Sequence, residues 1–294
     1  MRQPRTTPND LIACWQRYDW RQSMFAPGVV ILQALTQEGF TASGLGSHRE
    51  TAFARCLGET AELHALAAAG GAGRLGHCAL RDGLAAHPES RRAREAAVLE
   101  AFERQVIGDW WQGRRQARPL HPGWLIEAGI EARIAAARHE ADQRRPTGFW
   151  QVDSGGGPVV VIARSTNLAG QEPMLGYGCD PDAGRAARKA LRELLLMEVN
   201  LMELLATRAT HPGPDPMDKR IEDFARRCPA LLPLQGAVRP QGPGALMHED
   251  AQVWFGVPVE LREITPPTGP VAVWHCRPAL PVPDFAGDAG SPFV

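Results

Sequence analysis

The sequence predicts an α+β fold in which helices pack on mixed, largely antiparallel sheets. Short apolar runs of strand type are interspersed with long stretches whose leucines and alanines recur at helical spacing. With 294 residues, 44% of them hydrophobic, the chain is long enough to bury a sizeable core. We therefore expect a folded globular protein, and no repeat of solenoid period is visible in the sequence.

Charge and cysteine usage exclude several classes of protein. The net charge of −1 gives no argument for binding nucleic acid or an acidic membrane surface. No two cysteines have CxxC spacing, so neither a structural zinc site nor a redox dithiol is indicated. We expect buried thiols in a reducing compartment. The sequence shows neither a signal-peptide core nor an apolar run of membrane-spanning length, and we expect a cytoplasmic protein with no membrane contact.

The N-terminal part of the chain predicts two strands and a helix. Residues 1–28 are polar with scattered tryptophans and form a separate N-terminal segment that ends at Pro27-Gly28. Val29–Leu32 and Phe40–Ser43 are short runs of strand type. Arg49–Ala69 has apolar residues at helical spacing, and the glycines that follow it end the helix.

The remaining chain predicts further helices and a hairpin. Gly155-Gly156-Gly157-Pro158 is a turn that joins two strands, because a valine-rich run follows it directly. His77–Leu84 is ambiguous, and the last residues, 284–294, form a flexible tail rich in proline and glycine. The other expected elements are helices at Glu89–Val106, Leu125–Gln143 and Asp182–Thr207 and strands at Phe149–Val152, Val159–Ala163 and Val271–Cys276.

Thr41–Leu66 carries the chemistry that is easiest to interpret. Gly44-Leu45-Gly46-Ser47 predicts a glycine-rich turn at a helix start, where free backbone amides and the hydroxyl of Ser47 suit an anion. Glu59 and Glu62 follow on one helical face, where two carboxylates can share a cation. Turn and carboxylates together predict a site for magnesium and a polyphosphate.

A second stretch, Tyr177–Asn200, has the same order of features. Gly176-Tyr177-Gly178 leads into a turn at Cys179–Asp182 and then into a helix that carries Glu193. Two such stretches in one chain strengthen the prediction of a nucleotide site. Simpler explanations stay open: Glu59 could form an ordinary helix ion pair with Arg55, and Glu193 could pair with Arg192 or Lys189.

The order and spacing of these motifs resemble the YcaO-domain family. Gly44-x-Gly46-Ser47 followed by Leu57-Gly58-Glu59-x-x-Glu62 resembles its first motif. Gly176-Tyr177-Gly178-Cys179-x-Pro181-Asp182 followed by Ala190-Leu191-x-Glu193 resembles the second. Val259–Thr265 and the ending Pro278-Ala279-Leu280-Pro281 resemble its C-terminal strand and proline-rich end. The resemblance implies a YcaO-like ATP-binding domain over residues 29–283.

The resemblance also implies an activity and its cofactors, ATP and Mg2+. YcaO cyclodehydratases activate backbone amides of a ribosomally made precursor peptide by phosphorylation, and thus form the thiazoline or oxazoline rings of azole-containing peptides such as bacteriocins. Implied magnesium ligands are Glu59, Glu62 and Glu193. Implied nucleotide-binding residues also include Gly44, Gly46, Ser47 and Lys189, and Pro281 and Pro283 are the implied catalytic positions in the tail.

Departures from the family pattern support an alternative function. Leu63 stands where the family has arginine, and Leu196 stands where it has glutamine. The alternative is therefore a non-catalytic YcaO-like scaffold subunit whose ATP site has decayed. The chain also lacks an extra domain for a leader peptide, so we expect a heteromeric complex. Its expected partners are the precursor peptide, an E1-like leader-binding protein and a flavin dehydrogenase.

Overall fold

The computed structural model describes residues 8–70, 81–210, 213, 217–240, 251–267, 269–281 and 292. The chain divides into two compact units, which are described separately. The first unit comprises Met1–Gln22, Val29–Arg104 and Met247–Val282. The second comprises Ser23–Gly28, Gln105–Leu246 and Pro283–Val294. Every ladder between named strands is antiparallel, which confirms the predicted α+β class. Among the helices in the described ranges, none is long and apolar enough to cross a membrane.

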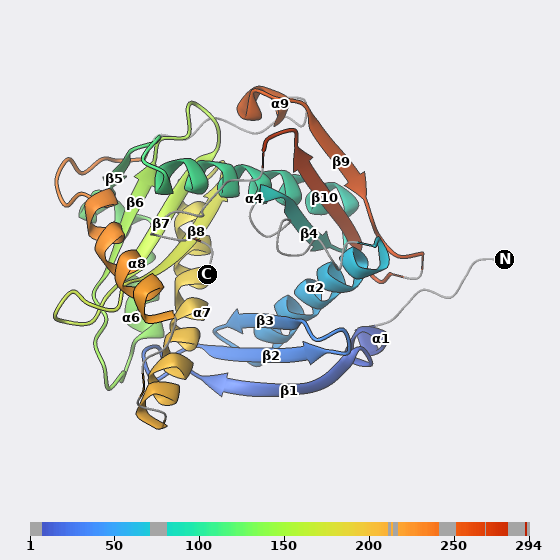
Figure 1. The fold of residues 1–294 in the computed structure, drawn as a ribbon, viewed down its shortest axis with the longest axis horizontal. Helices are drawn as coiled ribbons and strands as arrows, with labels where there is room; N and C mark the ends of the chain where they lie inside the picture. The colour runs from blue at the N-terminus through green and yellow to red at the C-terminus, as the bar shows by residue number, and fades with distance from the viewer. Residues whose placement is uncertain are drawn as a thin grey trace. The chain divides into compact units, whose positions relative to one another are not determined.

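The first unit contains two three-stranded sheets, ordered β1-β2-β3 and β4-β10-β9. Helix α2 packs on β2 and β3 and also contacts β4 (Figure 1). Its strands are β1 (Trp15–Gln22), β2 (Val30–Thr36), β3 (Thr41–Gly46), β4 (Gly83–His87), β9 (Val259–Glu263) and β10 (Ala272–Pro278). Its helices are α1 (Pro8–Ile12), α2 (Arg49–Ala68), α9 (Ala251–Phe255) and the first part of α4 (Ser90–Trp111).

The second unit is a four-stranded sheet in the order β5-β6-β7-β8, with α7 packed against β7 and β8. Residues Val159–Ala163 of β7 are all buried, so this strand forms the centre of the core. The strands are β5 (Ala117–Pro119), β6 (Thr147–Val152), β7 (Val159–Ser165) and β8 (Met174–Asp180). The helices are α5 (Pro122–Glu127), α6 (Ile130–Ala137), α7 (Ala183–Thr210), α8 (Met217–Leu231) and the end of α4.

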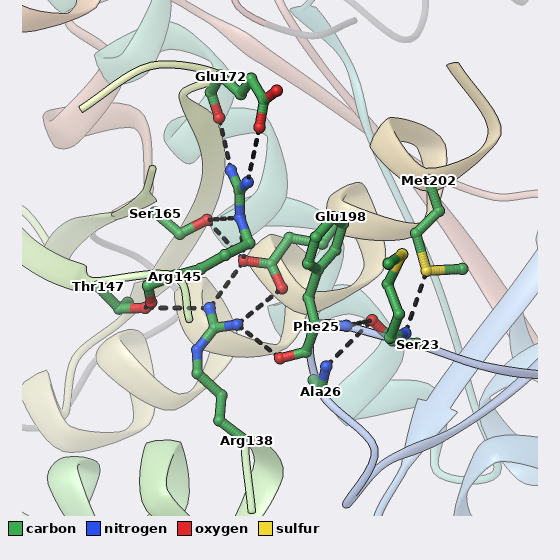
Figure 2. A network of polar contacts seen from close by, with 11 residues as sticks. Ser23, Phe25, Ala26, Arg138, Arg145, Thr147, Ser165, Glu172, Glu198 and Met202 are labelled. Atoms are coloured by element: carbon green, nitrogen blue, oxygen red, sulfur yellow. Dashed lines mark hydrogen bonds and ion pairs between the residues drawn. The ribbon is translucent and has the colours of Figure 1, made fainter. Parts of the chain in front are cut away.

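A buried ionic network fixes α7 in the second unit (Figure 2). Glu198 is fully buried, and its Oε1 accepts hydrogen bonds from Arg138 Nη2 at 2.7 Å and from Ser165 Oγ at 2.6 Å. Arg145, itself 3% exposed, lies 3.4 Å from the same carboxylate, and Arg138 also donates to the carbonyl of Phe25 at 2.9 Å. A buried carboxylate is tolerated when it is paired and hydrogen-bonded in this way. Glu198 therefore has a structural role.

Several sequence predictions need correction. The predicted glycine turn at residues 44–47 is wrong for its first three residues, because Gly44 and Gly46 lie within β3, in register with Leu32 and Val30 of β2. The helix predicted for Leu125–Gln143 is two short helices, α5 and α6, and Gly129 between them has a left-handed φ of 68°. The segment 1–28 contains a strand that was not predicted, β1, whose charged residues suit its position at a sheet edge.

Other predictions are confirmed. The hairpin around Gly155–Pro158 is the pair β6 and β7, and the predicted late strand is β10. The helices expected at residues 49–69, 89–106 and 182–207 correspond to α2, α4 and α7. Part of the ambiguous stretch 77–84 opens β4, while its residues 77–80 lie outside the described part of the chain.

Glycines in the strands allow close packing of the following helices. A Cβ added at Gly44 would lie 1.9 Å from the carbonyl oxygen of Ala52 in α2. A Cβ at Gly178 in β8 would lie 2.1 Å from the carbonyl oxygen of Ala186 in α7. These two glycines have the same spacing to the helix residue that they meet. Both strands therefore need glycine because a helix backbone occupies the space of the side chain.

This packing predicts that two glycine-to-alanine substitutions change the free energy of unfolding in opposite directions. Gly178→Ala should reduce the free energy of unfolding by about 1–3 kcal/mol, because the new methyl group overlaps the helix backbone. Gly58→Ala should increase it by about 0.5–1 kcal/mol, since alanine favours a helix interior. An added Cβ at Gly58 in α2 meets nothing within 4 Å. Urea unfolding followed by circular dichroism measures both, and a Gly178→Ala variant as stable as wild type would contradict the packing argument.

Candidate functional site

The two predicted carboxylates of α2 reach the edges of two different strands. Glu59 Oε2 accepts a hydrogen bond from the amide of Ser43 in β3 at 2.7 Å. Glu62 Oε1 accepts one from the amide of Ala86 in β4, also at 2.7 Å. The i,i+3 spacing places both carboxylates on the same side of the helix, as predicted. Each carboxylate is thus oriented by a backbone donor.

A third carboxylate, which the sequence analysis missed, joins this pair. Glu100 in α4 accepts a hydrogen bond from the amide of Leu84 in β4 at 3.0 Å through Oε2, and its Oε1 pairs with Arg104. The available signal was the spacing Glu100-x-x-Glu103, which repeats that of Glu59-x-x-Glu62. The sequence analysis assigned no site residue to the helix expected at Glu89–Val106, because the strand that Glu100 meets is distant in the sequence.

Glu59 and Glu100 act electrostatically on the third carboxylate, Glu62. The pKa of Glu62 is raised well above its usual value, first by burial and then by the negative charges of Glu100 and Glu59. The amide of Ala86 and the guanidinium of Arg104 act in the opposite direction. Crowded carboxylates of this kind are stabilised by a divalent cation, and their hard oxygen atoms suit magnesium. Within the described ranges, no group of three or more His, Cys, Asp or Glu side chains is already arranged to hold a metal ion.

The amides of Gly44 and Gly46 do not face outward as the turn prediction required. In an antiparallel ladder, neighbouring residues direct their backbone groups to opposite sides of the strand. The amide of Ser43 points to Glu59 and the carbonyl of Leu45 accepts from Arg55, so the two glycines point to β2. Glu59 and Arg55 of α2 thus bind the outward-facing backbone groups of β3, where the sequence analysis had predicted a bound anion.

The second unit contains the other predicted site residues. Lys189 Nζ donates to the carbonyl of Cys179 at 2.8 Å and lies 3.4 Å from Asp180 Oδ2. Glu193 Oε1 pairs with Arg192 at 3.1 Å, so the helix ion pair considered as an alternative is present. Gly178, Lys189 and Glu193 have the same spacing as three residues of the first unit: Gly44, Arg55 and Glu59. Strand β8 and helix α7 therefore repeat the local design of β3 and α2.

The predicted catalytic prolines occupy the end of the chain. Pro281 follows β10 and is exposed, while Pro283 lies outside the described residues. Most of the predicted tail, 284–294, is also outside them; Pro292 is described, and its carbonyl accepts a hydrogen bond from Tyr177 Oη at 3.0 Å. The remaining predicted residues are placed in the first unit, with Ser47 immediately after β3 and Glu59 and Glu62 in α2.

Solved structures resemble this chain in fold. A YcaO protein from Methanopyrus kandleri, bound with AMPPCP and Mg2+, has a TM-score of 0.52 at 14% identity, with 92% of this chain and 90% of that chain covered. An E. coli microcin synthetase McbBCD complex with pro-MccB17 bound has a TM-score of 0.59 at 12% identity, covering 94% and 90%. A heterocyclase in complex with substrate and cofactor has a TM-score of 0.60 at 15% identity, covering 93% of this chain and 52% of that one.

A family model identifies the chain more directly. No curated protein matches it. The model described as "YcaO cyclodehydratase, ATP-ad Mg2+-binding" matches residues 72–253, which is more than half of the chain. This match shows that the chain belongs to the YcaO cyclodehydratase family.

Proposed function

We propose that this chain is the ATP- and Mg2+-dependent subunit of a peptide cyclodehydratase. The observation that carries the proposal is the set of three carboxylates, Glu59, Glu62 and Glu100, which are oriented by strand-edge amides. Burial, and then the charges of Glu100 and Glu59, raise the pKa of Glu62. The family description names ATP and Mg2+, and the related Methanopyrus kandleri structure is bound with AMPPCP and Mg2+.

Each residue has a distinct proposed task. Glu59, Glu62 and Glu100 supply oxygen ligands, and Arg104 holds Glu100 in position through its ion pair. When bound, magnesium would neutralise polyphosphate charge, which is the main need of phosphoryl transfer. Lys189 and Glu193 are proposed as nucleotide- and metal-binding residues on the strength of the family motif. Both would have to leave their present partners to act.

The proposed reaction closes a ring in a ribosomally made peptide. A Cys, Ser or Thr side chain of the peptide attacks the preceding amide carbonyl carbon. The γ-phosphoryl group of ATP is transferred to the resulting oxygen, and loss of phosphate leaves a thiazoline or oxazoline. Transfer before loss converts a poor leaving group, hydroxide, into a good one, phosphate. Pro281, which lies three residues after the end of β10, and Pro283, two positions further along the sequence, are proposed to act in positioning this reaction.

A non-catalytic scaffold is the alternative, and specific observations favour it. Leu63 and Leu196 replace polar residues of the family pattern. Leu201, buried at 6% exposure, stands near a place on the same helix as Leu196 where the family has a charged residue. Lys189 and Glu193 both have partners within the chain. A scaffold would keep the fold without binding ATP, so nucleotide binding separates the two functions.

We further propose that the chain works in a complex in the cytoplasm. Its expected partners are the precursor peptide, an E1-like leader-binding protein and a flavin dehydrogenase. The similarity to the McbBCD complex with pro-MccB17 bound supports a heteromeric assembly. The described cysteines, Cys14, Cys56, Cys179, Cys228 and Cys276, form no disulfide, which suits a reducing compartment.

The first prediction tests ligand binding by thermal unfolding. Saturating ATP with magnesium should stabilise the wild-type chain by about 2.7 kcal/mol at a ligand concentration near 100 times the Kd. Glu59→Gln, Glu62→Gln and Glu100→Gln should each abolish most of this gain, because each removes a charged ligand. Glu95→Gln, which alters a carboxylate paired with the exposed Arg91 on α4, is the control and should retain it. Absence of any stabilisation in wild type would favour the scaffold.

The second prediction concerns pH in the absence of magnesium. A carboxyl group whose pKa is raised on folding contributes stability below its ordinary pKa, and this contribution is lost as the pH rises through the raised value. The metal-free wild type should therefore lose stability from about pH 4.5 toward neutral pH. Glu62→Gln should lose less over this range, since its amide oxygen still accepts from Ala86 without charge. If stability depended on pH in the same way in the wild type and in Glu62→Gln, folding would not raise the pKa of Glu62.

The third prediction concerns the partner. The isolated chain should form few or no rings in a Cys/Ser-containing precursor peptide, and addition of the leader-binding protein should restore ring formation. Mass spectrometry measures the loss of one water molecule per ring. Full, leader-dependent ring formation by the chain alone would contradict the need for a partner.

A further inference from the structure

Asp82, at the start of β4, is the centre of a buried ionic cluster that the proposed chemistry does not use. It is 2% exposed, and its Oδ1 accepts from Arg81 Nε at 2.8 Å. Its Oδ2 lies 2.9 Å from His275 Nε2 and accepts from Arg277 Nε at 2.9 Å. Arg81 also donates to the carbonyl of Leu280 at 2.6 Å. One carboxylate thus joins the start of β4, two residues of β10 and the segment after β10.

The position of this cluster matters because β4, which begins directly after Asp82, supplies the amides that orient two of the site carboxylates. Leu84 and Ala86 follow Asp82 at alternate positions, and their amides are the donors to Glu100 and Glu62. Strand β4 has five residues and lies at the edge of its sheet, with β10 as its pairing strand. A short edge strand has few ladder bonds to fix its end, and local opening of such strands is easy. The Asp82 cluster adds four polar contacts at that end.

We propose that Asp82 is a positioning residue that fixes β4 so that its amides hold Glu62 and Glu100 in place. Arg81, His275 and Arg277 serve this role by locking the Asp82 carboxylate against β10. Any effect of Asp82 on cofactor binding rests on the proposed function of Glu62 and Glu100. Its effect on the position of the β4 amides does not depend on that function.

The matching strand edge in the same unit provides an internal reference. The amide of Ser43 in β3 is held by Glu59 just as the amides of β4 are held by their carboxylates. Strand β3 pairs with β2 and belongs to a different sheet from β4 and β10, the strands that the Asp82 cluster joins. Loss of positioning should therefore affect Leu84 and Ala86 and spare Ser43, whereas general loss of stability affects all three.

The test is amide hydrogen exchange by NMR on the full chain without nucleotide or magnesium. Asp82→Asn should accelerate exchange at Leu84 and Ala86 by about tenfold relative to Ser43, and Asp82→Glu should restore part of the protection. Arg277→Gln is the second variant, for use if Asp82→Asn fails to fold. It removes one donor to Asp82 at a side chain that is 31% exposed, and it should accelerate exchange at Leu84 and Ala86 by a smaller factor. Arg91→Gln, which breaks an exposed ion pair on α4, is the matched control and should change none of the three amides.

Two results would overturn the proposal. One is equal acceleration at Ser43, Leu84 and Ala86, which would assign Asp82 to general stability. The other is unchanged exchange at Leu84 and Ala86 in both variants. Because the measurement needs no ligand, its failure is distinct from failure of the proposed function, which would appear as absent ATP stabilisation in wild type. If the proposal holds and ATP binds, Asp82→Asn should also weaken magnesium-dependent stabilisation, with a larger apparent Kd for the metal.

Discussion

The amides at the outer edges of β3 and β4 impose the constraint on which the candidate site depends. A backbone amide away from water must have an acceptor, and an edge strand has none on its outer side. Helix carboxylates meet this need at Ser43, Leu84 and Ala86. The same bonds fix the direction of the carboxylates, so the support of the sheets and the construction of the site use one set of contacts. The cost is a carboxyl group that is buried beside two other carboxylates, and both the burial and the neighbouring charges raise the pKa of Glu62.

The second unit shows what becomes of the same local design under different packing. Lys189 donates to the end of β8 as Arg55 donates to the end of β3. Glu193, at the place that corresponds to Glu59, pairs with its neighbour Arg192 and is half exposed. Glu198 on the same helix is instead fully buried between two arginines (Figure 2). Two glutamates on one helix thus have different surroundings, one half exposed beside an arginine and the other buried in an ionic network.

The sequence was sufficient for the fold class, for most helices and strands, and for the placement of Glu59 and Glu62 on one side of α2. Helical periodicity and the valine-rich hairpin are local signals, so they survive without knowledge of the rest of the chain. Three features depended on distant contacts and were missed. Gly44 resembles a turn residue because its true reason, the backbone of Ala52 pressed against it, appears only after packing. Strand β1 is polar because it lies at an edge, and Glu100 acquires meaning only when β4 lies beside it.

The leucines that depart from the family pattern are more informative in the structure than in the sequence. Leu63 packs at the side of the core cluster formed by Leu32, Ala34 and Cys56, so an arginine there would have to leave that contact. Leu201 is buried, which means that its position on α7 belongs to the core of the second unit. Both leucines therefore have packing roles of their own and need not be explained as damage to a site.

The carboxylates of the first unit are intact beside Leu63, and Arg104 supplies a cation to that cluster from α4. A chain that kept the fold alone would gain nothing from holding three like charges together, since uncharged acceptors such as glutamine could satisfy the same amides without repulsion. The gathering of three carboxylates is the physical argument for the proposed cation-binding role over a scaffold.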